Sequence, residues 1–170
     1  MFKNARTYLL FLGIVAPLCA SADDDSQSLA KFKGGIGVIP VSSAPGPALI
    51  AATVNRNIVR GVQPPGQIWV IEDLRADVKA DGSIRVDGRG LLLGGGNGIG
   101  GNANQSVRAT LICEVAAPVL HDTGLVPLEA NGDFRIDDVL TPPPPPDCAS
   151  PVLLIRNPAG AWFAAGIPKR

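Results

Sequence analysis

The chain has 170 residues, with 15 basic and 15 acidic side chains and a formal net charge of zero. The Lys and Arg residues are interleaved with Asp and Glu and form no basic patch or stripe, which argues against nucleic acid as a partner. Hydrophobic residues make up 46 % of the chain, which is enough for one domain with a core of its own.

The first 22 residues have the order of a cleavable signal peptide. Lys3 and Arg6 come before an apolar run from Tyr8 to Cys19, and the small residues 20–22 follow it. The run is shorter than the roughly 20 apolar residues that a membrane-spanning helix needs. The sequence therefore predicts a signal peptide over residues 1–22, a periplasmic or extracellular mature protein, and no membrane span after cleavage.

The rest of the chain divides into an arm and a β domain. Residues 23–47 mix Asp, Ser, Gly, Pro and Lys around one short apolar piece, so we expect a flexible N-terminal arm there. From residue 48 to 170, short apolar or alternating runs are separated by Gly, Pro, Asn and Asp, which is typical of all-β proteins. We expect an antiparallel β-sandwich of about seven or eight strands, immunoglobulin-like or jelly-roll-like, with a small β-barrel as the alternative.

The clearest predicted structure is a hairpin over residues 73–89. Apolar and charged residues alternate on both sides of Ala80-Asp81-Gly82. A three-residue loop at these positions pairs Val78 with Ile84 and places both apolar faces on one side, whereas a two-residue loop would place them on opposite sides. The same register sets three pairs of opposite charge across the strands, and Gly82 falls where the turn needs a positive φ angle.

Two further hairpins are predicted. The loop pattern recurs at Ala130-Asn131-Gly132, where the same rule pairs Leu128 with Phe134 and Val126 with Ile136. The recurrence is compatible with a repeated sheet unit or with two independent hairpins. The segment 157–160, Asn-Pro-Ala-Gly, is typical of a type I turn between two apolar runs.

Two cysteines remain after residue 22, Cys113 and Cys148. We expect a disulfide between them, because two thiols in one small exported domain usually pair. Alternation from Val107 to Val115 points Cys113 into the core and Arg108, Thr110 and Glu114 outward. The proline run 142–146 cannot pair in a sheet and is expected to be an extended connector that leads to Cys148. No CxxC motif accompanies the single histidine, so a zinc site is not predicted.

The candidate binding residues are Gly96, Asn97 and Gly98 of a glycine-rich loop, together with Trp69 and Trp162. The loop matches GxGxxG, but the residues after it predict a strand and not the helix that a nucleotide phosphate needs, so no cofactor is predicted. Such a loop at the end of a sheet could instead bind another ligand. The tryptophans are expected in the core, although on the surface they could contact a sugar or a protein.

His121 and Asp122 are the candidate catalytic pair of an alternative hypothesis, a small secreted hydrolase. Adjacent residues on a strand point to opposite faces, and the chain has no Gly-x-Ser-x-Gly motif, so the sequence favours a surface histidine and no catalytic residues. Asp122-Thr123-Gly124 also matches the aspartic protease motif, but only one copy is present.

The segments 88–93, 132–136, 151–156 and 160–165 resemble parts of small exported bacterial β-domain proteins of unknown function, and the resemblance covers roughly residues 55–167. It implies an exported bacterial protein without assigning an activity. The leading hypothesis is a non-catalytic binding or scaffolding module of the envelope or secretome, whose partner is a protein or glycan of the envelope.

Overall fold

A computed structural model describes residues 27–44, 53–114 and 116–169. The predicted signal peptide lies outside these residues. The described part of the chain contains strands and no helix. The strands are β1 (Ser28–Gly37), β2 (Val41–Ala44), β3 (Thr53–Arg56), β4 (Trp69–Val70), β5 (Asp73–Lys79), β6 (Ser83–Arg89), β7 (Leu92–Leu93), β8 (Ser106–Ile112), β9 (His121–Asp122), β10 (Val126–Pro127), β11 (Phe134–Val139), β12 (Val152–Arg156) and β13 (Trp162–Pro168).

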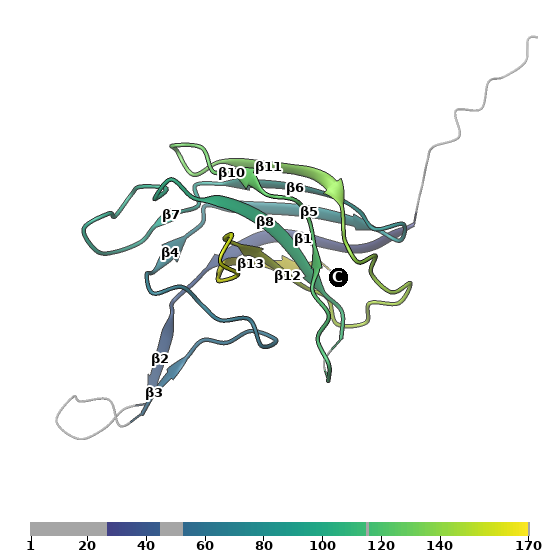
Figure 1. The fold of residues 1–170 in the computed structure, drawn as a ribbon, viewed down its shortest axis with the longest axis horizontal. Coiled ribbons are helices and arrows are strands. Elements are labelled where there is room, and N and C mark those ends of the chain that lie inside the picture. Colours follow the sequence, from purple (N-terminus) through teal and green to yellow (C-terminus); the bar gives the residue numbers. More distant parts are fainter. Residues whose placement is uncertain (1–26, 45–52, 115, 170) are drawn as a thin grey trace, which may run out of the picture.

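Most strands belong to one curled antiparallel sheet. Its order is β10-β8-β12-β13-β1-β5-β6-β11, and β9 pairs with β8 to complete nine strands. Figure 1 shows the sheet bent into a half-barrel around the core, as the twist of antiparallel strands favours. Its two ends approach each other where Asp122 and Thr141 exchange backbone hydrogen bonds of 3.0 and 2.9 Å. The all-β antiparallel class is therefore confirmed, with more strands than the seven or eight expected.

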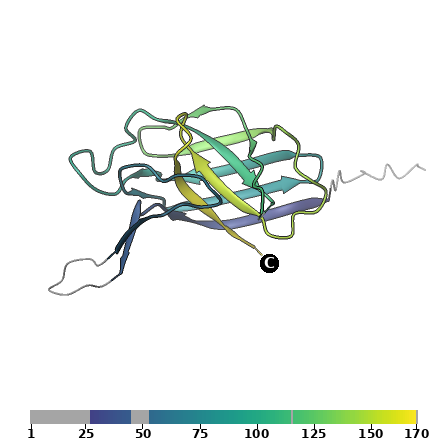
Figure 2. The same ribbon diagram turned by 60° about the horizontal axis from the view of Figure 1, so that its bottom comes forward.

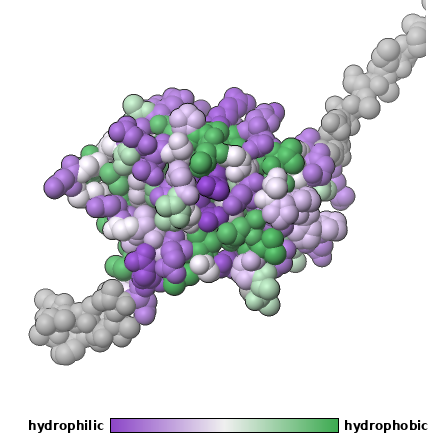
Figure 3. Space-filling model, viewed as in Figure 1, coloured by the Kyte–Doolittle hydropathy of each residue, from purple (hydrophilic) through white to green (hydrophobic). Residues whose placement is uncertain are grey.

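Two short ribbons complete the fold. β2 pairs with β3, and this ribbon projects from the body in both views of the molecule (Figures 1 and 2). β4 pairs with β7, with Trp69 opposite Leu93. On the face drawn in Figure 3, apolar patches are separated by strongly hydrophilic side chains. Most of the largest fully buried side chains come from β5, β6, β8, β11 and β12, so the core lies inside the curl of the main sheet.

The hairpin predicted over residues 73–89 is confirmed in its register. Val78 pairs with Ile84, and the three expected pairs of opposite charge face each other across β5 and β6. Gly82 has a φ of 86° and donates its N–H to the Lys79 carbonyl. Because apolar and charged residues alternate along both strands, the hairpin has one buried face and one face toward solvent.

The second hairpin is only half correct. Gly132 has a φ of 84° and donates to the Glu129 carbonyl, so the loop matches the first one. The strands beside it separate, however, because Val126 pairs with Val107 and Ile136 pairs with Val86. The predicted Val126–Ile136 pair is wrong. The carbonyl of Gly132 accepts from the N–H of Leu91, which anchors the loop beside the end of β6 and aligns β11 with that strand.

Residues 28–37, which we expected in a flexible arm, form strand β1 in the middle of the sheet. β1 lies between β13 and β5, and its Ala30 and Phe32 are buried between exposed lysines. Glycine is required where the strand passes its neighbours, because a Cβ atom at Gly37 would lie 2.2 Å from the Trp69 carbonyl oxygen. The three glycines of this strand are also typical of loops, which is why its sequence predicted a flexible arm and not a strand.

The C-terminal half agrees with the prediction in most respects. β12 and β13 form the third hairpin, with the N–H of Gly160 donating to the Asn157 carbonyl. The prolines 142–146 belong to no strand. Thr110 differs from expectation, because it is fully buried and not solvated. β9 pairs with β8 at this point, and the Thr110 hydroxyl donates to Asp122 of β9 in the polar network described below.

Candidate functional site

Three of the five predicted binding residues line one hollow, and a fourth, Gly96, is next to them in the chain. This hollow, which we call the Trp69 hollow, has a volume of about 370 Å³ and includes Trp69, Asn97 and Gly98 in its wall. Gly96 precedes these loop residues and lies so close to Gln67 that a Cβ atom would be 2.9 Å from the side-chain oxygen. The other wall residues are Pro65, Gly66, Gln67, Leu93, Ala103, Gln105, Asn157 and Phe163.

An aromatic pair forms the floor of the Trp69 hollow. The rings of Trp69 and Phe163 are stacked, with centroids 4.0 Å apart and planes 10° from parallel. Both side chains are buried, with exposed fractions of 3 % and 2 %. The prediction that Trp69 is a core residue is confirmed. Trp69 presents a small rigid apolar surface to the hollow, and its ring face is not exposed for a ligand to stack on.

The glycine-rich loop is a series of hydrogen-bonded turns. The N–H of Gly100 donates to the Leu93 carbonyl, and the N–H of Leu93 donates to Gly101. Gly96 and Gly100 have φ angles of 76° and 79°, which residues other than glycine rarely adopt. The residues after the loop enter strand β8 and not a helix. The loop therefore lacks the helix N-terminus that binds a nucleotide phosphate.

The wall of the Trp69 hollow carries amides and no charged side chain. Two of the four amides are occupied within the protein: the Asn157 oxygen accepts from the N–H of Ala161, and the Gln105 amide donates to the Ala103 carbonyl. Gln67 and Asn97 are exposed and form no hydrogen bond with the described residues. They are free to donate to and accept from a ligand, which suits an uncharged polar molecule.

Trp162 lies away from this hollow. Its indole N–H donates to the Asn57 carbonyl at 3.0 Å, and 3 % of the residue is exposed. The expected burial is confirmed, and the structure does not bring Trp162 together with the loop. Sequence reasoning missed Gln67, Gln105 and Asn157, which come from separate turns. The only local signal for Gln67 is its place after Pro64-Pro65-Gly66, two residues before Trp69.

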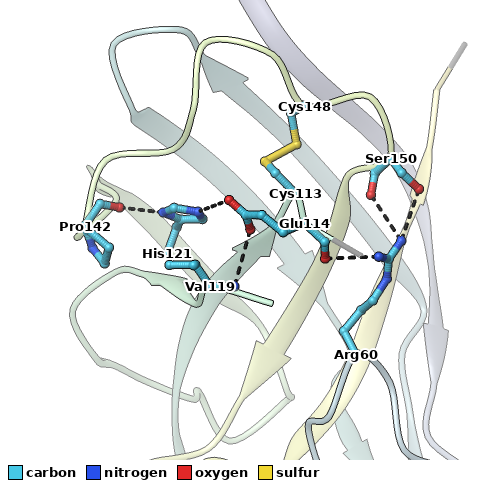
Figure 4. Close-up of a disulfide and its surroundings, with 8 residues drawn as sticks. All are labelled: Arg60, Cys113, Glu114, Val119, His121, Pro142, Cys148 and Ser150. Carbon is cyan, nitrogen blue, oxygen red and sulfur yellow. Dashed lines mark hydrogen bonds and ion pairs between the residues drawn. A yellow bond between two sulfur atoms is a disulfide. The ribbon is translucent and has the colours of Figure 1, made fainter. Parts of the chain in front are cut away.

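His121 is buried beside the disulfide, as Figure 4 shows, and the prediction of a surface histidine is wrong. Its Nδ1 lies 2.8 Å from the Pro142 carbonyl oxygen, and its Nε2 lies 3.7 Å from the Glu114 carboxylate. Desolvation raises the pKa of Glu114, but its own N–H, the N–H of Val119 and His121 outweigh this effect. The pKa of Glu114 therefore lies below its ordinary value.

Asp122 belongs to a different cluster. Its carboxylate accepts from the Thr110 hydroxyl and from Arg156 Nη1, and it lies 3.7 Å from Arg108. His121 and Asp122 do not contact each other as a catalytic pair. Within the described residues no hydroxyl or thiol hydrogen-bonds to His121. The nucleophile and base that hydrolysis requires are therefore not assembled around this histidine.

The expected disulfide between Cys113 and Cys148 is present. The two residues are 35 positions apart in the sequence, and each is 8 % exposed. Cys113 directly follows β8, and Cys148 follows the proline connector, so the bridge ties that connector to the end of a sheet strand. Buried disulfides persist in oxidising compartments, so this bridge indicates an environment outside the cytoplasm.

Comparison with known proteins identifies no relative, because no family model, curated protein or solved structure matches the chain. The described residues contain no helix that is long and apolar enough to span a membrane. They also contain no group of three or more His, Cys, Asp or Glu side chains placed to hold a metal ion.

Proposed function

We propose that the protein is an exported, non-catalytic binding module whose ligand occupies the Trp69 hollow. The observation that carries the proposal is the convergence of Trp69, Asn97 and Gly98 on one hollow of about 370 Å³. This volume is within the range of small-ligand sites, which combine an apolar floor with a few polar groups. The ligand class that fits is an uncharged molecule rich in hydroxyl or amide groups, such as an envelope glycan.

The chemistry of the wall supports a neutral ligand. A charged ligand buried there would lack a partner of opposite sign, because all the wall residues are uncharged. The amides of Gln67 and Asn97, which have no hydrogen-bond partner in the described part of the chain, each offer donors and an acceptor, which match the hydroxyl groups of a sugar. Trp69 and Phe163 are almost fully buried, so they add a small apolar contact at the floor of the hollow.

The test is thermal unfolding of the purified protein with a panel of neutral oligosaccharides. A ligand at about 100 times its Kd adds about 2.7 kcal/mol, which raises the Tm of a domain of this size by roughly 5–11 °C. The shift should be smaller in the Asn97→Ala and Gln67→Ala variants, because each lost hydrogen bond weakens binding by about 2- to 12-fold.

Gln27→Ala is the matched control, since Gln27 is an exposed amide outside the hollow. It should bind each oligosaccharide as the wild type does. If no neutral oligosaccharide shifts the Tm, or if Asn97→Ala and Gln67→Ala respond like Gln27→Ala, the Trp69 hollow is not the binding site.

Export is part of the proposal. The buried disulfide supports it, because the bond needs an oxidising compartment to form and persist. Expression of the full chain in a bacterial host should yield a periplasmic or secreted product whose N-terminus is near Asp23. A product that retains residues 1–22 in the cytoplasm would contradict export.

The finer description of the fold that we propose is a β-sandwich formed by bending one sheet. The contact between the two ends of the sheet supports this description. In the described residues the ends meet through an isolated bridge between Asp122 and Thr141 and through a hydrogen bond from the N–H of Gly124 to the Asp138 carboxylate. A closed barrel would have a continuous ladder of backbone hydrogen bonds at this position. Amide hydrogen exchange tests the seam, because a closed ladder would protect the amides of residues 122–126 as strongly as those of β5.

A further inference from the structure

A second and larger hollow lies apart from the Trp69 hollow and shares no wall residue with it. Its volume is about 690 Å³, and two arginines, Arg60 and Arg156, stand in its wall. The wall comes from three separate segments: the turn at residues 60–63, the residues 118 and 120 before β9, and the turn between β12 and β13. We call this the arginine hollow.

Arg60 occupies a backbone position that disfavours it. Val59 and Val62 exchange two backbone hydrogen bonds around Arg60-Gly61, whose φ angles are 49° and 80°. This is the geometry of a type I′ turn, in which Asn, Asp or Gly is preferred at the first of the two positions. A residue with a Cβ atom has an energetic cost at this left-handed backbone position, because the Cβ comes close to the following carbonyl oxygen. The turn therefore does not explain why the residue is an arginine.

One donor group of the Arg156 guanidinium has no hydrogen-bond partner among the described residues. Only 9 % of the residue is exposed, and its Nε donates to the Gly160 carbonyl at 3.0 Å. Its Nη1 donates to the Thr110 hydroxyl and to Asp122. Its Nη2 hydrogen-bonds to none of the described residues, although a guanidinium offers five donors. The nitrogen is not sealed from solvent, so it can donate to a molecule in the hollow.

The charges around Arg156 leave a positive excess. Arg108 faces Arg156 directly across β8 and β12, and among the residues that the structure describes Asp122 is the one carboxylate that contacts both. One carboxylate neutralises only one of two guanidiniums, and like charges side by side across a sheet repel each other. Nε of Arg108 is also buried without a partner in the described part of the chain.

Arg60 adds to this excess. Its guanidinium donates to the Glu114 carbonyl and to the hydroxyl and carbonyl of Ser150, as Figure 4 shows. All of these acceptors are neutral. Arg60 makes no ion pair with the described residues, whereas the Glu114 carboxylate is directed to His121 and Val119. An anion in the hollow would therefore meet two arginines that the protein itself does not fully neutralise.

The remainder of the wall is largely apolar. Val62, Pro118, Leu120, Ala159 and Ala161 contribute to it, with one amide from Gln63. A volume of about 690 Å³ accommodates a small organic molecule. A simple inorganic anion would leave these apolar residues uncovered, while a neutral apolar molecule would leave the guanidiniums without a partner.

We propose that the arginine hollow binds a small organic acid with an apolar body. The carboxylate accepts from Nη2 of Arg156 and is attracted by Arg60, and the body of the ligand covers Val62 and Leu120. Arginine suits this role, because its planar donors match the geometry of a carboxylate. The proposal is independent of the ligand of the Trp69 hollow.

The probes are 4-phenylbutyrate and its amide, which have the same body and differ in charge. Isothermal titration of the purified protein, in a buffer free of carboxylates, should show the acid binding about ten- to a hundred-fold more tightly than the amide. The preference should shrink as salt is added, because Arg60 is only half-buried and salt screens its charge. Equal affinities for the two probes, or no binding of the acid up to its solubility limit, would overturn the proposal.

Two variants at one exposed position locate the site. Ala159 lies in the turn before Gly160, where side chains larger than alanine can point to solvent. Ala159→Glu places a carboxylate at the hollow and should weaken binding of the acid about ten-fold or more, whereas Ala159→Gln, of equal size, should change it less than about threefold. Equal effects of the two substitutions would contradict the charge argument.

Arg60→Gln gives a second, independent measurement. It should reduce the affinity for 4-phenylbutyrate while leaving that for the amide unchanged, because only the acid uses the charge. Arg75→Gln is the matched control, since Arg75 is an exposed arginine on β5 that pairs with Asp73 and is not in the wall. If Arg60→Gln and Arg75→Gln bind the acid as the wild type does, Arg60 does not hold the ligand and the proposal fails.

Discussion

Replacement of Gly88 by alanine tests how β11 is held against β6. Gly88 is paired with Phe134 across these strands, and the ring lies directly over the glycine. A Cβ atom at position 88 would be 2.1 and 2.2 Å from two ring carbons, whereas ordinary contact begins at 3.4 Å. The ring, which is 3 % exposed, would have to move by at least about 1.3 Å within a packed core.

Such overpacking costs about 1–3 kcal/mol, and displacement of the buried ring places this site at the upper end of that range. We expect Gly88→Ala to lower the free energy of unfolding by about 2–3 kcal/mol and the Tm by roughly 4–12 °C. Urea unfolding followed by circular dichroism measures the first quantity. Gly66→Ala is the control, because nothing lies within 4 Å of a Cβ atom at Gly66, and it should be neutral or slightly stabilising.

A double-mutant cycle with Phe134→Leu separates the clash from other effects. Leucine has no ring to displace, so the cost of Gly88→Ala should fall by about 1 kcal/mol or more in that background. The reasoning is refuted if Gly88→Ala stays within about 0.5 kcal/mol of the wild type, or if the two substitutions are additive.

Two further predictions concern the region of Figure 4. Replacing both Cys113 and Cys148 by alanine should reduce stability by about 4 kcal/mol, the chain-entropy value for this loop, and a reductant should destabilise the wild type but not this variant. Because the pKa of Glu114 is depressed in the folded protein, its contribution to stability is present above the ordinary carboxylate pKa and is lost as the pH falls through the folded value. Glu114→Gln should therefore flatten the dependence of Tm on pH on the acid side, and an unchanged slope would contradict the assignment.

The two hollows differ in how far the sequence could predict them. Asn97, Gly98 and Trp69 were recognised from composition, because a glycine-rich loop and a rare tryptophan stand out locally. Arg60 and Arg156 did not stand out, since they are 96 positions apart and resemble other scattered arginines. Their shared hollow arises only when the turn at residues 60–63 docks beside the turn after β12.

The buried state of His121 was also beyond sequence reasoning. β9 has only two residues, so alternation gives no reliable inner and outer face. What buries the histidine is the proline connector after β11, whose Pro142 carbonyl lies against its ring. Contacts between segments about 20 residues apart depend on the path of the connector, which composition does not specify.

The sequence by itself determined the all-β class, the register of the β5–β6 hairpin, the turn at residues 157–160 and the Cys113–Cys148 pair. These features depend on alternation, on turn residues a few positions apart, or on having only two cysteines to join, so local chemistry is sufficient.

Only the tertiary structure decided which strands become neighbours. β1 enters the middle of the sheet because Gly37 lets its backbone pass Trp69, and β11 joins β6 because Gly88 leaves room for Phe134. Each choice depends on the fit between surfaces that are distant in the sequence, and close packing makes that fit selective. The two hollows follow from the same choices, since each is formed where turns from different parts of the sheet meet.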